Sequence, residues 1–419
     1  MSGDVEDAYR AHWAYVLAAT VRVTRDLDLA EECAQEAFAQ ALVVWPRDGL
    51  PQQPAAWLVT VAKRRAVDVL RREQTLRAKL PLLALPADDS DKSDISEKPD
   101  HRPDGSPDDR LRLVFTCCHP ALARDAQVAL TLRLVCGVAT PDVARAFLVS
   151  EATMAARVTR AKKKIAAARI PFRVPRASEL PERLDAVLSV VHLLYTSGHT
   201  AASGPELLRA DLTGRAVHLA RMLHRLMPDE PEAAGLLALV LLLDARKETR
   251  TGPDGRLLRL DEQDRTRWDR ALIEEGRDLV LRALRYRGAR PAGRYLLQAA
   301  IAALHAEAPS FAETDWRQIV ELYDGLRAAW PSPVVDLNRA VALSMADGPE
   351  AALREVERLE GDPRLAGYHY LPAVKADLLD RLGRAAAADE AFRAALALTA
   401  NEAEREYLHG RLSRHRPDA

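Results

Sequence analysis

The chain has 419 residues, a formal net charge of −1, and a composition that is 48% hydrophobic and 29% charged. This length exceeds what one hydrophobic core usually supports, and the balance excludes an intrinsically disordered chain. The four cysteines do not suggest a disulfide framework, and we find neither a signal peptide nor an apolar stretch long enough for a membrane span. We therefore expect a cytoplasmic protein of two to four domains, and because Ala, Leu and Arg dominate, an all-α one.

Residues 1–77 predict a bundle of three amphipathic helices. Helix signals cover 7–25 and 28–44, a loop rich in Pro follows at 45–54, and a third helix covers 55–77. The second helix combines a carboxylate-rich surface with an apolar stripe that we expect in the core: Leu29, Cys33, Phe38 and Leu42.

The third helix carries a basic surface beside two tryptophans. We expect Trp57, Val61 and Val67 to face inward, which leaves a run of cations outside: Lys63, Arg64, Arg65, Arg71 and Arg72. Cations hold phosphates, and rings such as Trp45 and Trp57 receive unstacked bases of single-stranded DNA. An acidic helix next to a basic one suits a protein that bridges a basic protein and DNA.

Residues 78–109 are rich in Asp, Ser and Pro. They cannot bury enough apolar area to order themselves, so we expect a flexible acidic linker. From position 88 onward its acidic residues are Asp88, Asp89, Asp91, Asp94, Glu97, Asp100, Asp104, Asp108 and Asp109.

Residues 110–172 predict a second small helical domain with a helix-turn-helix. Thr140 and Pro141 begin one helix, residues 148–150 form the turn, and Ser150 caps a second helix that Glu151 favours electrostatically. The spacing of Met154, Val158, Ala161 and Ile165 turns these side chains inward. The outward residues able to reach a major groove are Thr153, Ala156, Arg157, Arg160, Lys163 and Lys164.

Charge supports the same interpretation. Between Leu111 and Pro175 the sequence has eleven cationic and three acidic residues. This segment therefore carries a local charge of about +8, although the net charge of the whole chain is −1. A solvated basic helix face remains the alternative to DNA binding.

Residues 178–419 predict a third, helical region. Its segments 337–359 and 373–398 resemble each other at an offset of 36 residues, close to the tetratricopeptide period of 34. Two similar helical hairpins without a repeat ancestry are the alternative.

Three features could indicate other chemistry. The adjacent cysteines of the CCH stretch (117–119) have no CxxC partner, so we expect no metal site and no cofactor. The segment 260–269 is dense in carboxylates and arginines and suits a salt-bridged helix start better than an acid–base site. Histidines such as His192 are expected to be packed or exposed rather than ligands.

Several of these segments together resemble a known family. The patterns DLAEECAQEAF (28–38), WLVTVAKRRAVDVLRR (57–72) and the C-terminal RVTRAKKK (157–164) are similar to regions 2 and 4 of bacterial sigma-70 family sigma factors of the extracytoplasmic-function (ECF) group. The remainder is similar to the subgroup that carries a long tetratricopeptide-like C-terminal extension. The resemblance covers nearly the whole length and implies no enzymatic activity.

The resemblance implies roles for the charged helices. The acidic helix would dock on the β′ clamp helices of core RNA polymerase, through Asp28, Glu31, Glu32, Gln35, Glu36 and Phe38. The following loop and helix would melt the −10 element and capture a flipped base, through Trp45, Arg47, Asp48, Trp57, Lys63, Arg64 and Arg65. Relatives often carry Asn where Arg64 stands.

The second domain would read the −35 element and meet the β flap. Its candidates are Glu151, Thr153, Ala156, Arg157, Arg160, Lys163 and Lys164, with Ala155 and Ala156 where relatives are often polar. The acidic linker would thread toward the RNA exit channel, and the extension would regulate the factor through a protein or ligand. A ligand-responsive helix-turn-helix repressor is the alternative function, and an enzyme with a site around Asp264 or His192 is a further one.

Overall fold

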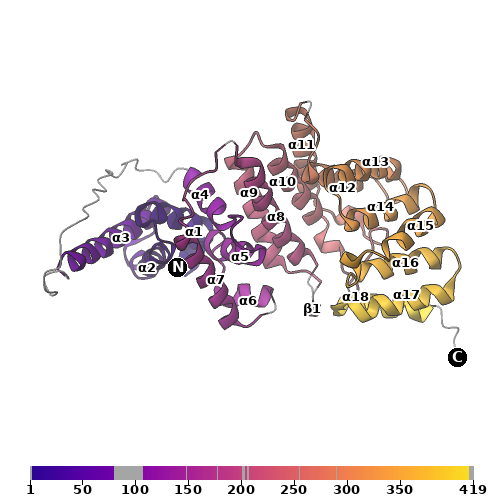
Figure 1. The fold of residues 1–419 in the computed structure, drawn as a ribbon, viewed down its shortest axis with the longest axis horizontal. Coiled ribbons are helices and arrows are strands. Elements are labelled where there is room, and N and C mark those ends of the chain that lie inside the picture. Colours follow the sequence, from indigo (N-terminus) through magenta and orange to yellow (C-terminus); the bar gives the residue numbers. More distant parts are fainter. Residues whose placement is uncertain are drawn as a thin grey trace. The chain divides into compact units, whose positions relative to one another are not determined.

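The computed structural model describes residues 2–79, 107–147, 149–176, 178–200, 203–204, 207–253, 255–288 and 290–414. Most of these residues are helical, which confirms the all-α prediction (Figure 1). The chain divides into two compact units, Met1–Val190 and Val191–Ala419. Most of the predicted linker lies outside the described residues.

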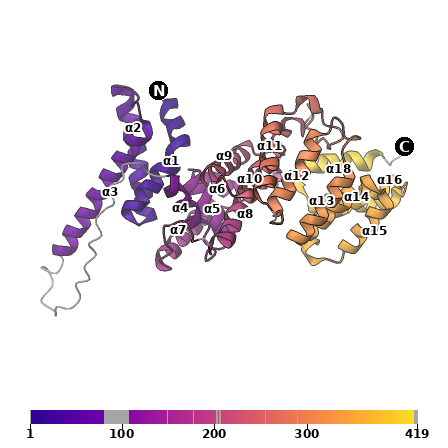
Figure 2. The ribbon, with the colours of Figure 1, turned by 90° about the horizontal axis from the view of Figure 1, so that it is seen from above.

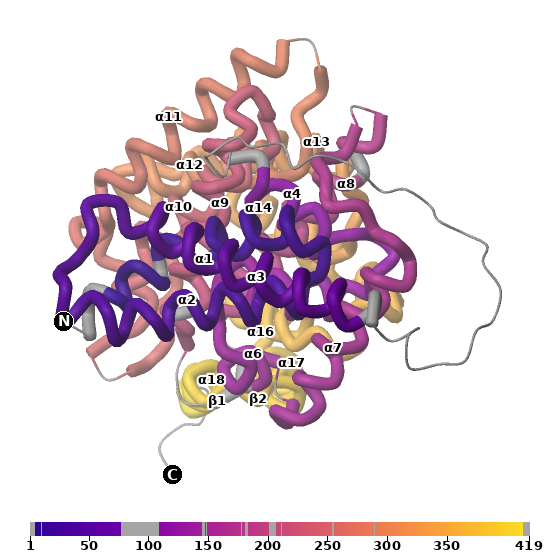
Figure 3. Tube along the Cα trace, turned by 90° about the vertical axis from the view of Figure 1, so that its left-hand side faces the viewer, coloured from indigo at the N-terminus to yellow at the C-terminus, as the bar shows by residue number. Residues whose placement is uncertain are grey.

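The first unit begins with the predicted bundle of three helices: α1 (Ser2–Thr24), α2 (Leu27–Asp48) and α3 (Pro54–Lys79). Figure 3 shows them side by side. Trp13, Leu17 and Leu58 are fully buried between them and form its core. Each such aromatic or leucine side chain contributes roughly 1.5–3 kcal/mol on burial.

The second helix is longer than the sequence predicts. It continues through Pro46 to Asp48 and ends where Gly49 adopts a φ of 89°. Proline deprives the carbonyl four residues earlier of its donor, and that residue, Leu42, is 53% exposed, so water can replace the missing bond. The predicted loop therefore shrinks to its second half.

The second part of this unit contains α4 (Pro107–Cys117), α5 (Arg124–Leu130), a π-helical turn η2 (Thr131–Val135), α6 (Thr140–Ala146) and α7 (Glu151–Ala167). The helix start at Thr140 and the helix that follows Ser150 are confirmed. The end of the predicted linker is wrong. Asp108 and Asp109 belong to α4, and the Asp109 carboxylate is buried between Arg22 at 3.5 Å and Arg112 at 3.0 Å.

The next helix, α8 (Leu180–His199), starts in the first unit and ends in the second. Its first half is tied to α4 and α5 by two side-chain bonds. Arg183 donates to the Phe115 carbonyl at 2.7 Å, and Arg124 donates to the Ala186 carbonyl at 3.2 Å.

The second unit is a succession of helices that pack on their neighbours in sequence (Figures 1 and 2). They are α9 (Ala210–Leu226), α10 (Pro231–Asp244), α11 (Arg270–Tyr286), α12 (Arg294–Glu307), α13 (Trp316–Ala329), α14 (Pro333–Ala346), α15 (Pro349–Leu359), α16 (Tyr370–Arg381), α17 (Ala385–Leu398) and α18 (Glu402–Arg414). Short turns η3 (Lys247–Thr249), η4 (Arg265–Arg267) and η5 (Pro363–Leu365) lie between them.

The apolar segment in the middle of this unit is a core helix. Helix α10 is buried on nearly every side, and Gly235 lets it approach α12 so closely that a Cβ there would lie 2.6 Å from the Leu296 nitrogen. In the part of the chain that the structure describes, no helix is long and apolar enough to cross a membrane.

The two similar C-terminal segments form consecutive helical hairpins, α14 with α15 and α16 with α17. Superposed positions are buried alike: Ala340 and Ala376 are inaccessible to solvent, and Leu343 and Leu379 are 9% and 5% exposed. A two-residue parallel ladder, β1 (Ser203–Gly204) with β2 (Ala400–Asn401), joins the two ends of the unit.

Candidate functional site

The acidic face of α2 is fixed by a cap and a core stripe. The Asp26 carboxylate caps the helix by accepting from the backbone nitrogens of Asp28 at 2.7 Å and Leu29 at 2.9 Å. The buried residues Ala30, Ala34 and Ala37 anchor one side. The opposite side exposes four of the six predicted polymerase-binding residues: Asp28, Glu32, Gln35 and Glu36.

The other two predicted polymerase contacts are buried. Phe38 is 5% exposed and packs in the core, with its ring centroid 5.0 Å from that of Tyr9 and 6.0 Å from that of Trp13. It therefore holds α2 in place rather than presenting a surface contact. Glu31 is 7% exposed.

The predicted apolar stripe of α2 is partly wrong. Cys33 and Phe38 are buried, but Leu42 is 53% exposed, as is its neighbour Val43 at 72%. The prediction placed the inward position after Phe38 four residues on, at Leu42, whereas the buried positions there are Ala41 and Trp45. Two aliphatic side chains consequently extend the exposed acidic face.

A cation from the second domain occupies part of this face. The Lys162 ammonium of α7 lies 2.7 Å from Asp28 Oδ1 and 2.6 Å from Glu31 Oε2, and its side chain is only 9% exposed. Arg133 of η2 forms a second ion pair with Glu31. Burial opposes the ammonium charge, but the Glu31 and Asp28 carboxylates outweigh it and raise the pKa of Lys162.

Neither Lys162 nor Arg133 was predicted as a site residue. A signal for Lys162 was present, because it lies four residues after Val158 and three before Ile165, on the inward stripe of its helix. A lysine at an inward position needs a buried partner. Nothing in the sequence could name that partner, which is about 130 residues away along the chain.

The candidate −10 residues lie around the end of α2 and the start of α3. Trp45 is 5% exposed and meets Trp57 edge to face, with centroids 5.6 Å apart. Arg47 and Asp48 are exposed and bind each other through two hydrogen bonds of 2.7 and 3.0 Å.

The basic surface of α3 is rotated relative to the prediction. Leu58, Ala62 and Ala66 form the buried stripe, whereas Trp57, Val61 and Val67 are half-buried. Of the three cations assigned to the −10 element, Arg64 is exposed, while Lys63 and Arg65 are half-buried. Burial and the nearby Arg22 lower the pKa of Lys63.

The faces of α7 agree with the prediction. The Ser150 hydroxyl accepts from the Thr153 nitrogen at 3.2 Å, and the four predicted inward residues are buried. Five predicted residues are exposed: Glu151, Thr153, Arg160, Lys163 and Lys164. Ala156 and Arg157 are half-buried, and the Arg157 guanidinium lies 3.6 Å from Asp125 and 5.6 Å from the centre of the Phe147 ring.

The other sequence features serve the fold. Cys117 and Cys118 are buried, burial raises the pKa of the Cys118 thiol to about 11, and its sulfur lies 3.4 Å from Thr131 Oγ1. Among the described residues no cluster of His, Cys, Asp and Glu could hold a metal ion. In the segment 260–269, Asp264 caps η4 and Asp269 caps α11, so these carboxylates begin helices.

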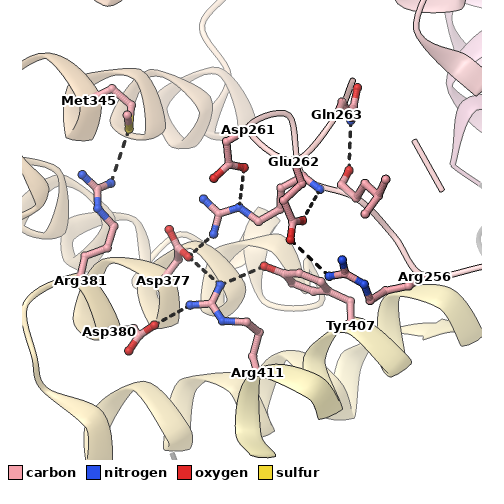
Figure 4. A network of polar contacts seen from close by, with 12 residues as sticks. Arg256, Asp261, Glu262, Gln263, Met345, Asp377, Asp380, Arg381, Tyr407 and Arg411 are labelled. Atoms are coloured by element: carbon pink, nitrogen blue, oxygen red, sulfur yellow. Dashed lines mark hydrogen bonds and ion pairs between the residues drawn. The ribbon is translucent and has the colours of Figure 1, made fainter. Parts of the chain in front are cut away.

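The second unit contains a cavity of about 280 Å³ between α14, α16, α17 and α18. Its walls are mostly apolar, including Val341, Val374 and Phe392, with His369, Asp377 and Glu404 among the polar groups. Figure 4 shows the network at one wall, where Arg411 lies between Asp377 and Asp380 and binds Tyr407 of its own helix.

Comparisons with known proteins follow this division of the chain. Residues 8–75 match the family model of sigma-70 region 2, residues 112–165 match sigma-70 region 4, and residues 183–284 match a family of unknown function, DUF6596. These matches cover the three-helix bundle, the helix-turn-helix domain and the segment from α8 to α11, respectively. No solved structure matches the chain.

Two relatives carry the comparison further. An uncharacterized protein of Rhizobium meliloti (strain 1021) is 47% identical over 94% of this chain and 92% of its own length. A probable ECF RNA polymerase sigma factor, SigI of Mycobacterium tuberculosis (strain CDC 1551 / Oshkosh), is 28% identical over 41% of this chain and 58% of its own length. The chain thus belongs to one family with the Rhizobium meliloti protein and has the sigma-70 region 2 and region 4 domains of a sigma factor, joined to a DUF6596 domain.

Proposed function

We propose that this protein is a sigma factor of the ECF type that reads a −35 element with α7 and melts a −10 element with the end of α2 and α3. Core RNA polymerase and promoter DNA are the partners that sigma-70 domains imply. The observation that carries the proposal is the division of α7 into a buried stripe and an exposed face with Thr153, Arg160, Lys163 and Lys164.

On that face, affinity and specificity come from different residues. Lys163 and Lys164 supply phosphate contacts that any DNA sequence would satisfy. Ala155 and Ala156 have no hydrogen-bonding groups, so base readout falls to Thr153, Arg157 and Arg160, together with DNA shape. The Arg157 contacts with Asp125 and Phe147 hold its side chain near the helix surface.

For the −10 element, the tryptophan pair and the cations have complementary tasks. Trp45 and Trp57 form an apolar corner against which an unstacked base can pack, and Arg64 is exposed to hold the strand by a phosphate. The exposed acidic and aliphatic side of α2 is offered to the β′ clamp helices. Buried Phe38 sets the position of that helix.

We also propose that the C-terminal unit regulates the factor. Support comes from its cavity, whose apolar walls and few polar groups are typical of ligand pockets, and from its stacked helical hairpins. Deletion of residues 200–419 tests this role and spares the first half of α8, which is bonded to α4 and α5. Unchanged promoter activity and unchanged regulation would contradict it.

Transcription in vitro with purified core polymerase tests the main proposal. The wild-type protein should give a core complex and a promoter-specific transcript. Replacing Arg160 and Lys163 together with alanine should weaken promoter binding at least tenfold and reduce the slope of log affinity against log salt by about two. Arg393→Ala, at an exposed position of α17, is the matched control and should change neither quantity. Specific DNA binding without any core complex or transcript would favour the repressor instead.

A further inference from the structure

Besides the Arg22–Asp109 pair of α1 and α4, the two sigma domains of the first unit meet in a charged and an aromatic contact. The charged contact is the one described above, in which Lys162 and Arg133 of the second domain hold Glu31, and Lys162 also holds Asp28. Both Lys162 and Glu31 are 9% exposed as side chains. Burying such a pair costs several kcal/mol of lost hydration per ion, which close opposite charges must offset.

The aromatic contact fixes the same two domains a few residues away. The Trp13 indole of α1 donates to the Leu134 carbonyl at 3.0 Å, and the Tyr9 hydroxyl donates to the Gly137 carbonyl at 3.2 Å. Gly137 has a φ of 67°, and a Cβ there would lie 2.9 Å from the Trp13 ring. The fit between α1 and the turn after η2 therefore depends on a residue without a side chain.

This closed arrangement conflicts with promoter binding on geometric grounds. Elements at −35 and −10 are about 25 base pairs apart, or roughly 85 Å at ~3.4 Å per base pair. In the closed unit α7 touches Asp28, and from Asp28 to Trp45 the helix spans only about 26 Å at ~1.5 Å per residue. The two DNA-reading faces must separate before both elements can be bound, and the 28 residue steps from Lys79 to Pro107 are long enough to allow it.

It also conflicts with polymerase binding, because the same carboxylates are needed twice. Glu31 and Asp28 cannot hold Lys162 and also pair with cations of a polymerase subunit. In the free protein, helix α7 therefore binds the same face of α2 that we assigned to the polymerase.

We propose that Lys162 and Arg133 act as an internal competitor for the polymerase-binding face of α2, and that the free factor is held closed until core polymerase takes over Glu31 and Asp28. This inference rests on the proposed function of that face. It assigns to Lys162 a role different from that of its neighbours Lys163 and Lys164, which point to solvent.

Binding of core polymerase in the absence of DNA tests the competition. Lys162→Glu places a third carboxylate against Asp28 and Glu31, and should raise the affinity for core about tenfold. Lys162→Met keeps the length of the side chain without its charge and should raise the affinity about three- to fivefold, which protects the test if the glutamate variant folds poorly. Arg169→Glu makes the same charge change at an exposed position just after the end of this helix and should alter core affinity less than twofold.

A second readout reports the closed state without polymerase. Spin labels at Ala39 of α2 and Ala166 of α7, both exposed, give the distance between the domains in a Cys136→Ser background. The distance should be short in the otherwise unchanged protein and should lengthen when Lys162 is replaced by Met or Glu.

The outcomes separate the two proposals. Folded Lys162 variants that bind core no better than wild type and keep the short distance overturn the competition. If the distance lengthens in these variants but neither they nor wild type bind core, the closed state stands and the sigma-factor assignment of the face fails.

Discussion

Two buried charge clusters, one in each unit, use the same chemistry under different constraints. Lys162 and Arg411 are each 9% exposed and each bind two carboxylates. The partners of Arg411 are 31 and 34 residues away in the same hairpin stack, whereas those of Lys162 are 131 and 134 residues away.

That difference in sequence separation makes the Arg411 cluster a permanent structural contact and the Lys162 cluster an exchangeable one. The Arg411 cluster is closed by short connections and stacks its guanidinium on Phe392 at 4.9 Å, so every partner belongs to one folding unit. The Lys162 cluster has to overcome the entropy of closing a much longer loop. Its carboxylates also lie on a helix face that a partner can compete for. The same ion pair can therefore be permanent in one place and exchangeable in another.

The largest expected effect on stability comes from removing the Arg411 cluster. Arg411→Ala removes the cation that Asp377 and Asp380 share, together with a stacking contact, and should lower the free energy of unfolding of the C-terminal unit by about 3–5 kcal/mol. Urea unfolding of the full chain measures it. Arg393→Ala removes an exposed pair with Asp389 in the same unit and should cost less than about 0.5 kcal/mol. Equal effects of the two variants on the free energy of unfolding would show that the Arg411 cluster does not stabilise the C-terminal unit.

Acid should weaken the second unit through its buried histidines. Burial, aided by nearby arginines, lowers the pKa of His192 and of His305 to about 4, against ~6.5 when unfolded. The unfolded chain then binds more protons between these values, so stability is complete above pH ~6.5 and falls as the pH drops. From pH 7 to 5 we expect a loss of about 4 kcal/mol for the pair.

Unfolding midpoints across that pH range measure this loss. The variant His305→Gln should lose about half of this pair's share of the acid dependence, and His199 and His224, whose pKa values burial also lowers, contribute the remainder. His409→Gln, which changes an exposed histidine of α18, should show the full acid dependence. An acid dependence that is as large in the double variant His192→Gln/His305→Gln as in the wild type would exclude these two residues as contributors.

The contact between the two sigma domains can be weakened without changing a charged residue. Gly137→Ala adds a methyl group 2.9 Å from the Trp13 ring at a positive φ, and should destabilise the first unit by about 2 kcal/mol. Gly383→Ala imposes a similar φ of 71° with nothing within 4 Å, so it measures the backbone strain alone, about 1 kcal/mol. Thermal unfolding and core binding are compared for both variants. If only the domain contact matters for release, Gly137→Ala should also raise core affinity, and Gly383→Ala should not.

Much of the fold follows from local sequence. The three-helix bundle, the Thr140 helix start, the Ser150 cap and the inward stripe of α7 were all predicted, because caps and helical periodicity act over a few residues. The predictions were wrong where the sequence allowed more than one choice of the residues that face inward. In α2 the stripe continued to Leu42 instead of Trp45, and in α3 it was placed on Trp57 instead of Leu58, since alanines on the true inward face carry little hydrophobic signal.

The candidate site was predicted as a set of residue types and not as an arrangement. The sequence by itself determined that α2 is acidic, that α7 is basic, and that Phe38 belongs to the core stripe. Only the tertiary structure decided that Lys162 is buried and meets Glu31 and Asp28. The reason is physical: helix faces are fixed by neighbours three and four residues away, whereas a buried ion pair depends on packing between segments that the sequence separates by more than a hundred residues.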